Sequence, residues 1–102
     1  MRQVTRFSIP ATAVSLAVIP PAMAYTGQEL AKNAQISIKQ ARAIALKLHA
    51  GEITDEELEK ERGGSRLRYS FDIKRRGATQ EVGVDAKTGR VLENKKEGPH
   101  PD

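Results

Sequence analysis

The sequence predicts an α+β fold in which one N-terminal helix packs on a three- to four-stranded antiparallel sheet. Residues 38–48 place apolar side chains at helical spacing. Residues 67–73 and 82–84 instead alternate apolar and polar side chains, the period of two that is typical of strands. Short glycine-containing segments separate the strands, so hairpins are expected. A chain of 102 residues fits a single domain.

Residues 1–24 have the pattern of a secretory signal peptide. Two arginines precede an uncharged apolar run over residues 7–19, and residues 22–24 form an A-x-A cleavage site. The run is shorter than the roughly 20 residues that cross a bilayer. We therefore expect cleavage after Ala24, a periplasmic or secreted location, and no stable membrane span afterwards. The alternative is an uncleaved N-terminal anchor.

The net charge limits the kinds of partner that the protein can bind, and the cysteine content decides whether disulfides can stabilise it. The formal net charge is +4, but Arg2 and Arg6 would leave with the signal peptide. Residues 25–102 then carry 15 basic and 13 acidic residues, a formal charge of +2. This small charge, together with export, argues against a nucleic-acid partner. No cysteine is present, so no disulfide supports the small core.

The helix is expected to follow an N-terminal arm over residues 25–35, which forms either a turn or two of helix or a loose segment. Ser37 is a good N-cap, and Gln40 three residues later completes a capping-box pattern. Gly51 is the expected C-terminal cap. The predicted apolar face consists of Ile38, Ala41, Ile44, Ala45 and Leu48.

The turn at residues 76–77 sets the register of the central hairpin. With these two residues at its tip, Phe71 and Tyr69 face Val82 and Val84 on one side of the sheet. Each aromatic–β-branched pair is worth a few tenths to about 1 kcal/mol. The alternate positions, which include Arg68, Ser70, Glu81 and Asp85, are expected to face solvent.

Residues 57–61 are predicted to form a strand that pairs through a turn at Gly63-Gly64. In this register acidic side chains meet basic ones, and apolar side chains meet apolar ones. The predicted facing pairs are Glu61–Arg66, Glu59–Arg68 and Leu58–Tyr69. A helix is the alternative, because residues 54–57 have a capping-box pattern and Glu and Lys favour helices.

A last strand begins at Val91, after a turn that Gly89 closes with a positive φ. The charged residues that follow are expected to fray, and we assign residues 95–102 to a flexible tail. The folded domain is therefore expected to span residues 36–94.

The residue types argue against catalysis. The serines after the signal peptide lie at a cap, a turn and a strand face, while the two histidines lie at a helix end and in the tail. No pair has the spacing of a zinc site. We therefore expect a protein that is not an enzyme and that holds no metal or cofactor. The residues considered are Ser37, Ser65, Ser70, His49 and His100.

One basic cluster is a candidate binding site. Lys74, Arg75 and Arg76 follow one another at the predicted hairpin tip. They are our candidate partner-binding residues, for a protein or for an anionic envelope surface. Binding to such a surface would weaken strongly with salt.

The order of these segments resembles the PepSY domain. The matching motifs are Ile38-x-x-Ala41-x-x-Ile44-Ala45-Leu46, Tyr69-x-Phe71-x-Ile73 and, most specifically, residues 81–92, EVGVDAKTGRVL. The resemblance covers residues 35–93. One departure is Glu56, where the family commonly has an apolar residue, so we expect the first strand to be a short or loosely held edge.

The resemblance implies a non-catalytic exported binding or regulatory module. PepSY domains occur in propeptides of secreted metallopeptidases and alone in exported proteins. The first hypothesis is a regulator or inhibitor of a peptidase, which acts through an exposed strand edge and the basic tip. The second is a ligand- or metal-sensing accessory of an envelope signalling or redox system. The expected partner is accordingly a peptidase or a membrane sensor.

The second hypothesis needs a pocket between helix and sheet. Its expected lining is Ile44, Leu48, Tyr69 and Phe71. The simpler alternative is that these four side chains form the core.

Overall fold

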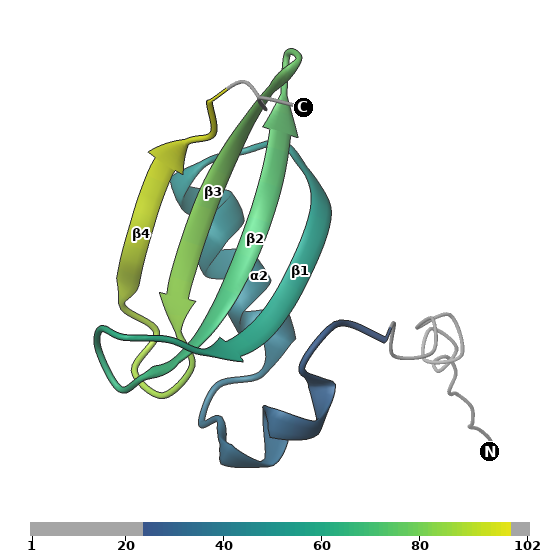
Figure 1. Cartoon of the computed structure of the whole chain (residues 1–102). Helices are drawn as coiled ribbons and strands as arrows, with labels where there is room; N and C mark the ends of the chain where they lie inside the picture. The colour runs from purple at the N-terminus through teal and green to yellow at the C-terminus, as the bar shows by residue number, and fades with distance from the viewer. Residues whose placement is uncertain (1–23, 99–102) are drawn as a thin grey trace, which may run out of the picture.

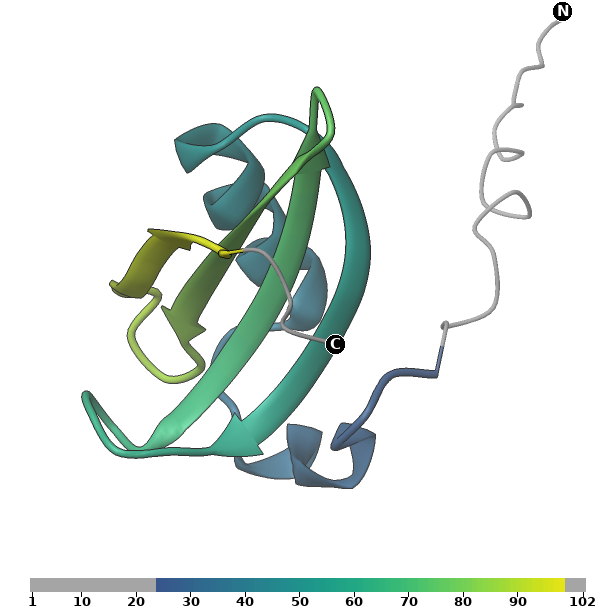
Figure 2. The same cartoon turned by 45° about the horizontal axis from the view of Figure 1, so that its top comes forward.

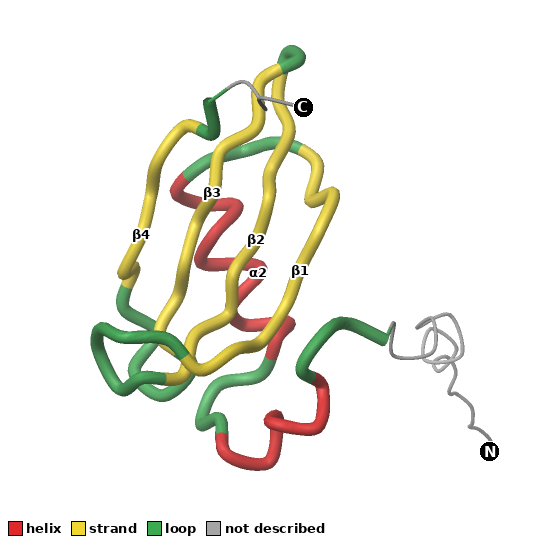
Figure 3. Tube along the Cα trace, in the orientation of Figure 1, coloured by secondary structure: helices red, strands yellow, loops and turns green. Residues whose placement is uncertain are grey.

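The computed structural model, which describes residues 24–98, has the expected α+β fold. Its antiparallel sheet contains four strands in the order β1-β2-β3-β4, and α2 lies across one face (Figures 1 and 3). All of the expected signal peptide except Ala24, and residues 99–102 of the expected tail, fall outside the described residues. The elements are the 3-10 helix η2 (Gln28–Asn33), α2 (Ile38–Leu48), β1 (Glu52–Lys60), β2 (Leu67–Arg75), β3 (Ala78–Asp85) and β4 (Val91–Lys96).

The central hairpin has the predicted register. Phe71 pairs with Val82 and Tyr69 with Val84, so both predicted aromatic–β-branched pairs form. Arg76 and Gly77 connect the strands with φ values of 53° and 81°. Two positive φ values are what a two-residue hairpin turn requires, because that turn matches the twist of the strands.

The strand predicted over residues 57–61 is confirmed, but it is longer than expected. β1 has nine residues, and the predicted pairs Leu58–Tyr69 and Glu59–Arg68 are both present. The expectation of a short edge strand is therefore wrong. Pairing along the whole length of β2 outweighs the helix propensity of the glutamates and lysines.

The capping box at the start of α2 is confirmed. Ser37 Oγ accepts from the Gln40 N–H, and Gln40 Oε1 accepts from the Ser37 N–H. Ala41 and Ala45 are fully buried against the sheet. Two expectations fail at the other end. Leu48, in the last helical position, is 45% exposed, and His49 rather than Gly51 is the C-cap.

The core lies between α2 and the face of the sheet that it covers, and no helix or strand within residues 24–98 covers the opposite face (Figure 2). Tyr69 and Phe71 are completely buried there. The simpler alternative, a core role, is therefore confirmed for these two residues. The Tyr69 hydroxyl donates to the carbonyl of Ile36 over 2.8 Å, so it also holds the segment before α2.

Alternation predicted that Arg68 faces solvent, and this prediction is wrong. Its side chain is buried on the face of the sheet that α2 does not cover. Its side chain crosses Gly83, where a Cβ would lie 3.0 Å from Arg68 Cδ. Its guanidinium donates to the Glu93 carboxylate and to the Arg62 carbonyl. Arg68 therefore pairs with Glu93 of β4, although its backbone faces Glu59 of β1. Ser70, also expected to face solvent, is buried and donates to Glu59.

Asp85 was also expected to face solvent, but it is only 1% exposed. The carboxylate accepts from the N–H and hydroxyl of Ser65 and from the N–H groups of Lys87 and Thr88. It therefore joins the β1–β2 loop to the β3–β4 turn. Periodicity misses this role because Asp85 ends β3 and its side chain turns into the adjoining loops.

β4 also runs farther than expected. It begins at Val91 as predicted and continues to Lys96, with Gln80 facing Lys96 across the ladder. Glu93 to Lys96 thus belong to the sheet, because Gln80 and Val82 of β3 offer them pairing partners.

Candidate functional site

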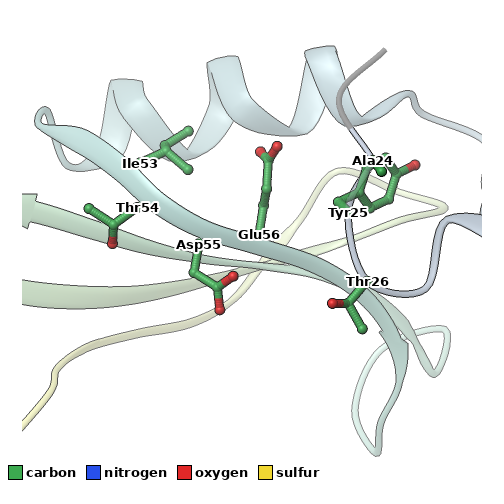
Figure 4. Close-up of a pocket in the computed structure, with 7 residues that line it drawn as sticks. All are labelled: Ala24, Tyr25, Thr26, Ile53, Thr54, Asp55 and Glu56. Carbon is green, nitrogen blue, oxygen red and sulfur yellow. The ribbon is translucent and has the colours of Figure 1, made fainter.

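A groove lies along the free edge of β1. Its volume is about 530 Å³, and it separates the N-terminal arm from the first half of the strand (Figure 4). In Figure 4 the Glu56 side chain points toward α2, whereas Asp55 points to the other side of the strand. The lining residues are Ala24, Tyr25, Thr26, Ile53, Thr54, Asp55 and Glu56.

β1 is an edge strand, and the arm covers only part of that edge. Thr26 bridges to Glu57, and its carbonyl accepts the Leu58 N–H over 2.8 Å. In an antiparallel strand, backbone groups two residues apart point the same way. Glu56 therefore directs its backbone N–H toward this same edge, beside the groove, where no described strand lies next to β1. Such an edge is a template for another extended segment.

An ion pair fixes the wall of this groove. Arg42 of α2 donates from Nε and Nη2 to the two carboxylate oxygens of Glu56, each over 2.8 Å. The side chains are 33% and 17% exposed. The hydrogen bond to Glu56 raises the pKa of Arg42, so the guanidinium stays charged. Glu56 therefore occupies an apolar position of the family pattern without leaving an unpaired carboxylate.

We predict that Arg42 and Glu56 are energetically coupled. A double-mutant cycle of Arg42→Ala and Glu56→Ala should give a coupling free energy of about 1–2 kcal/mol, because the bidentate pair is partly buried. Urea unfolding of the four proteins measures this energy. Additive losses would contradict the pair's role in holding β1 to α2. The pair Lys95–Glu93, in which the Lys95 side chain is 64% exposed, provides a comparison, and its coupling should be smaller than that of Arg42 and Glu56.

Tyr25 closes the arm end of the groove. It is half-buried against the core cluster. Burial, followed by the negative charge of Glu56, raises the pKa of its hydroxyl, so it remains a neutral hydrogen-bonding group. The groove thus presents an aromatic ring at one end and carboxylates along its strand side.

The basic cluster predicted from the sequence lies at the far end of the β2–β3 hairpin, away from the groove (Figure 1). Lys74, Arg75 and Arg76 are all exposed, and none of them forms an ion pair with another residue of the range 24–98. Strand alternation places Lys74 and Arg75 on opposite faces of the sheet. The three residues are therefore close together without sharing one surface.

The buried carboxylate of Asp85 is placed for structure rather than for proton transfer. Burial would raise the pKa of Asp85, but its four hydrogen bonds lower that pKa to about 2. A carboxyl group with this pKa is a poor general base near neutral pH. Within residues 24–98 no group of His, Asp and Glu side chains is arranged to hold a metal ion, and no helix is long and apolar enough to cross a membrane.

Sequence reasoning missed the groove because its walls come from distant segments. One signal was available. Glu56 lies two residues before the buried Leu58, so alternation places both side chains on the helix-covered face, where a carboxylate needs a cation. The bridge from Thr26 to β1 has no comparable signal, because a single parallel bridge leaves no periodicity.

Comparison with known proteins places the chain in a family. The model of the PepSY family, described as the peptidase propeptide and YPEB domain, matches residues 35–95. No curated protein and no solved structure gives a match. The matched range includes α2 and all of the strands except the last residue of β4. Because this range is more than half of the sequence, the chain belongs to the PepSY family.

Proposed function

We propose that this protein is a non-catalytic exported module that binds and regulates a peptidase of the cell envelope through the free edge of β1. The observation that carries the proposal is the groove beside Glu56, where no described strand covers the edge of β1. PepSY domains are generally non-catalytic propeptide or regulatory modules, which supports a binding role.

The groove favours an extended peptide segment over a small ligand. Its strand side supplies the backbone N–H of Glu56, a donor that an extended partner segment can pair with directly. Ile53 and Tyr25 offer apolar contact at its two ends, and the exposed carboxylate of Asp55 favours a segment with basic side chains. Such recognition uses main-chain hydrogen bonds for affinity and the side-chain contacts for specificity.

The test compares two substitutions at one position. Glu56→Pro removes the backbone N–H at the edge, whereas Glu56→Ala keeps it, and both lose the ion pair with Arg42 equally. We expect capture of an envelope peptidase from an extract of the source cells to be about tenfold weaker for Pro than for Ala, the effect of losing one hydrogen bond.

Proline is tolerated on edge strands, so the Pro variant should remain folded, which circular dichroism checks. Equal capture of the peptidase by the Pro and Ala variants would contradict strand addition at this edge. Capture of a membrane sensor in place of a peptidase would contradict the assignment of a peptidase as the partner. It would not contradict binding of a partner at the free edge of β1.

A further inference from the structure

A second hollow, separate from the groove, is lined by basic side chains near the C-terminal end of α2. Its volume is about 280 Å³. It is lined by the C-cap of α2, the β2–β3 hairpin and the end of β4, which are distant in sequence. Its lining consists of His49, Arg75, Arg76, Ala78, Thr79, Gln80 and Lys96.

The strand register explains why these cations share one side. Ile73 is buried on the helix-covered face, and alternation puts Arg75 on that same face, beyond the end of α2. Gln80 faces Ile73 across β2 and β3, and Lys96 faces Gln80 across β3 and β4. Arg75, Gln80 and Lys96 therefore project from the same face of three adjacent strands, next to His49.

The hollow holds positive charge without a carboxylate in its wall. None of its seven lining residues is acidic. Within residues 24–98, neither Arg75, Arg76 nor Lys96 forms an ion pair. Alternation places the neighbouring acidic strand residues Glu52, Asp72 and Glu81 on the opposite face. Like charges gathered this way repel one another, and a bound anion relieves that repulsion.

We propose that this hollow binds a phosphate group. Two guanidinium groups and one ammonium group supply three positive charges, which suit a dianion better than a single carboxylate. Guanidinium forks match phosphate oxygens with paired hydrogen bonds, and Lys adds a point charge. The hydroxyl of Thr79 and the amide of Gln80 add neutral hydrogen-bonding groups. The phosphate group could come from free phosphate or from a phospholipid headgroup of the envelope.

The experiment uses the protein purified after expression with its own export signal. Amide NMR shifts are followed during titration with inorganic phosphate, and sedimentation is measured with phosphatidylglycerol-containing vesicles and with pure phosphatidylcholine vesicles. Arg75→Ala removes a charge from the hollow. Lys74→Ala is the matched control, because it removes the same charge from the neighbouring position on the other face. Both side chains are exposed, so neither variant should unfold.

We expect saturable shifts at His49, Gln80 and Lys96, with binding about tenfold weaker in Arg75→Ala and changed by less than about twofold in Lys74→Ala. A response to free phosphate alone assigns that source, and a response to anionic vesicles alone assigns the headgroup. Equal weakening by both variants, or no response to either ligand, would overturn the proposal. The site does not depend on β1, so its failure leaves the proposed function intact.

Discussion

Asp85→Ala should lower the free energy of unfolding by about 3–5 kcal/mol, the range for breaking a buried hydrogen-bond network. The substitution leaves the N–H groups of Ser65, Lys87 and Thr88 without their acceptor. Urea unfolding followed by circular dichroism measures the loss. Removal of an exposed carboxylate, in Glu52→Ala, should cost less than about 0.5 kcal/mol. A loss below about 1 kcal/mol for Asp85→Ala would contradict the structural role of Asp85.

The same carboxylate should make stability depend on pH. Its pKa in the folded protein is about 2, below the value of about 3.9 in an unfolded chain. The unfolded state then binds the proton more readily, so the stabilisation is complete above about pH 4 and is lost as the pH falls toward 2. Asp85→Ala should remove this part of the acid dependence, and an unchanged acid profile would count against it.

Two other carboxylates oppose this trend, which is why the comparison with the variant is needed. Burial, followed by neighbouring carboxylates, raises the pKa of Glu81. Burial also raises the pKa of Glu59, with further contributions from Glu57 and Glu61. A carboxyl group with a raised pKa in the folded state favours folding as the pH falls. Subtracting the profile of Asp85→Ala from that of the unaltered protein isolates Asp85.

Gly27→Ala is expected to release the N-terminal arm from β1. Gly27 has a φ of 85°, and a Cβ there would overlap the backbone carbonyl of Leu58. Strain of this kind costs about 1–3 kcal/mol, so detachment of the arm becomes the less costly response. We expect the amide of Leu58, which now donates to Thr26, to lose its protection from hydrogen exchange.

The sheet itself should stay intact in this variant. The amide of Tyr69, a core residue of β2, should keep its protection. Gly98→Ala is the control, because nothing lies within 4 Å of a Cβ at that position. Since release of the arm lengthens the open edge of β1, peptidase capture should be retained or increased. Unchanged protection of Leu58 would show that the arm is held by other contacts.

Sequence patterns within a few residues predict the helix start and the hairpin turn of this fold. The capping box at Ser37 and the turn at residues 76–77 were both predictable, because each depends on residues close in sequence. The register of β1 followed from charge and apolar pairing with β2. Family resemblance added the fold and the expectation of a non-catalytic role.

Side-chain contacts between segments that are distant in sequence could not be predicted from the sequence. Arg68 was expected to face solvent, but Gly83 leaves room for its side chain to reach Glu93 on β4. Asp85 was interpreted as a solvated strand residue, although the β1–β2 loop folds over it. Both errors arise because alternation states which face a side chain occupies but not what covers that face.

The most direct test of the proposed function locates the contact on the protein. A photo-crosslinking amino acid is placed at Asp55, which is exposed in the groove, and in a second protein at Lys39, which is exposed on α2. Both proteins are irradiated in envelope extracts of the source cells. Binding along β1 predicts crosslinks to a peptidase from position 55 that excess unmodified protein competes away, and none from position 39. Identical products from both positions, or no peptidase crosslink from position 55, would contradict binding of a peptidase at this edge.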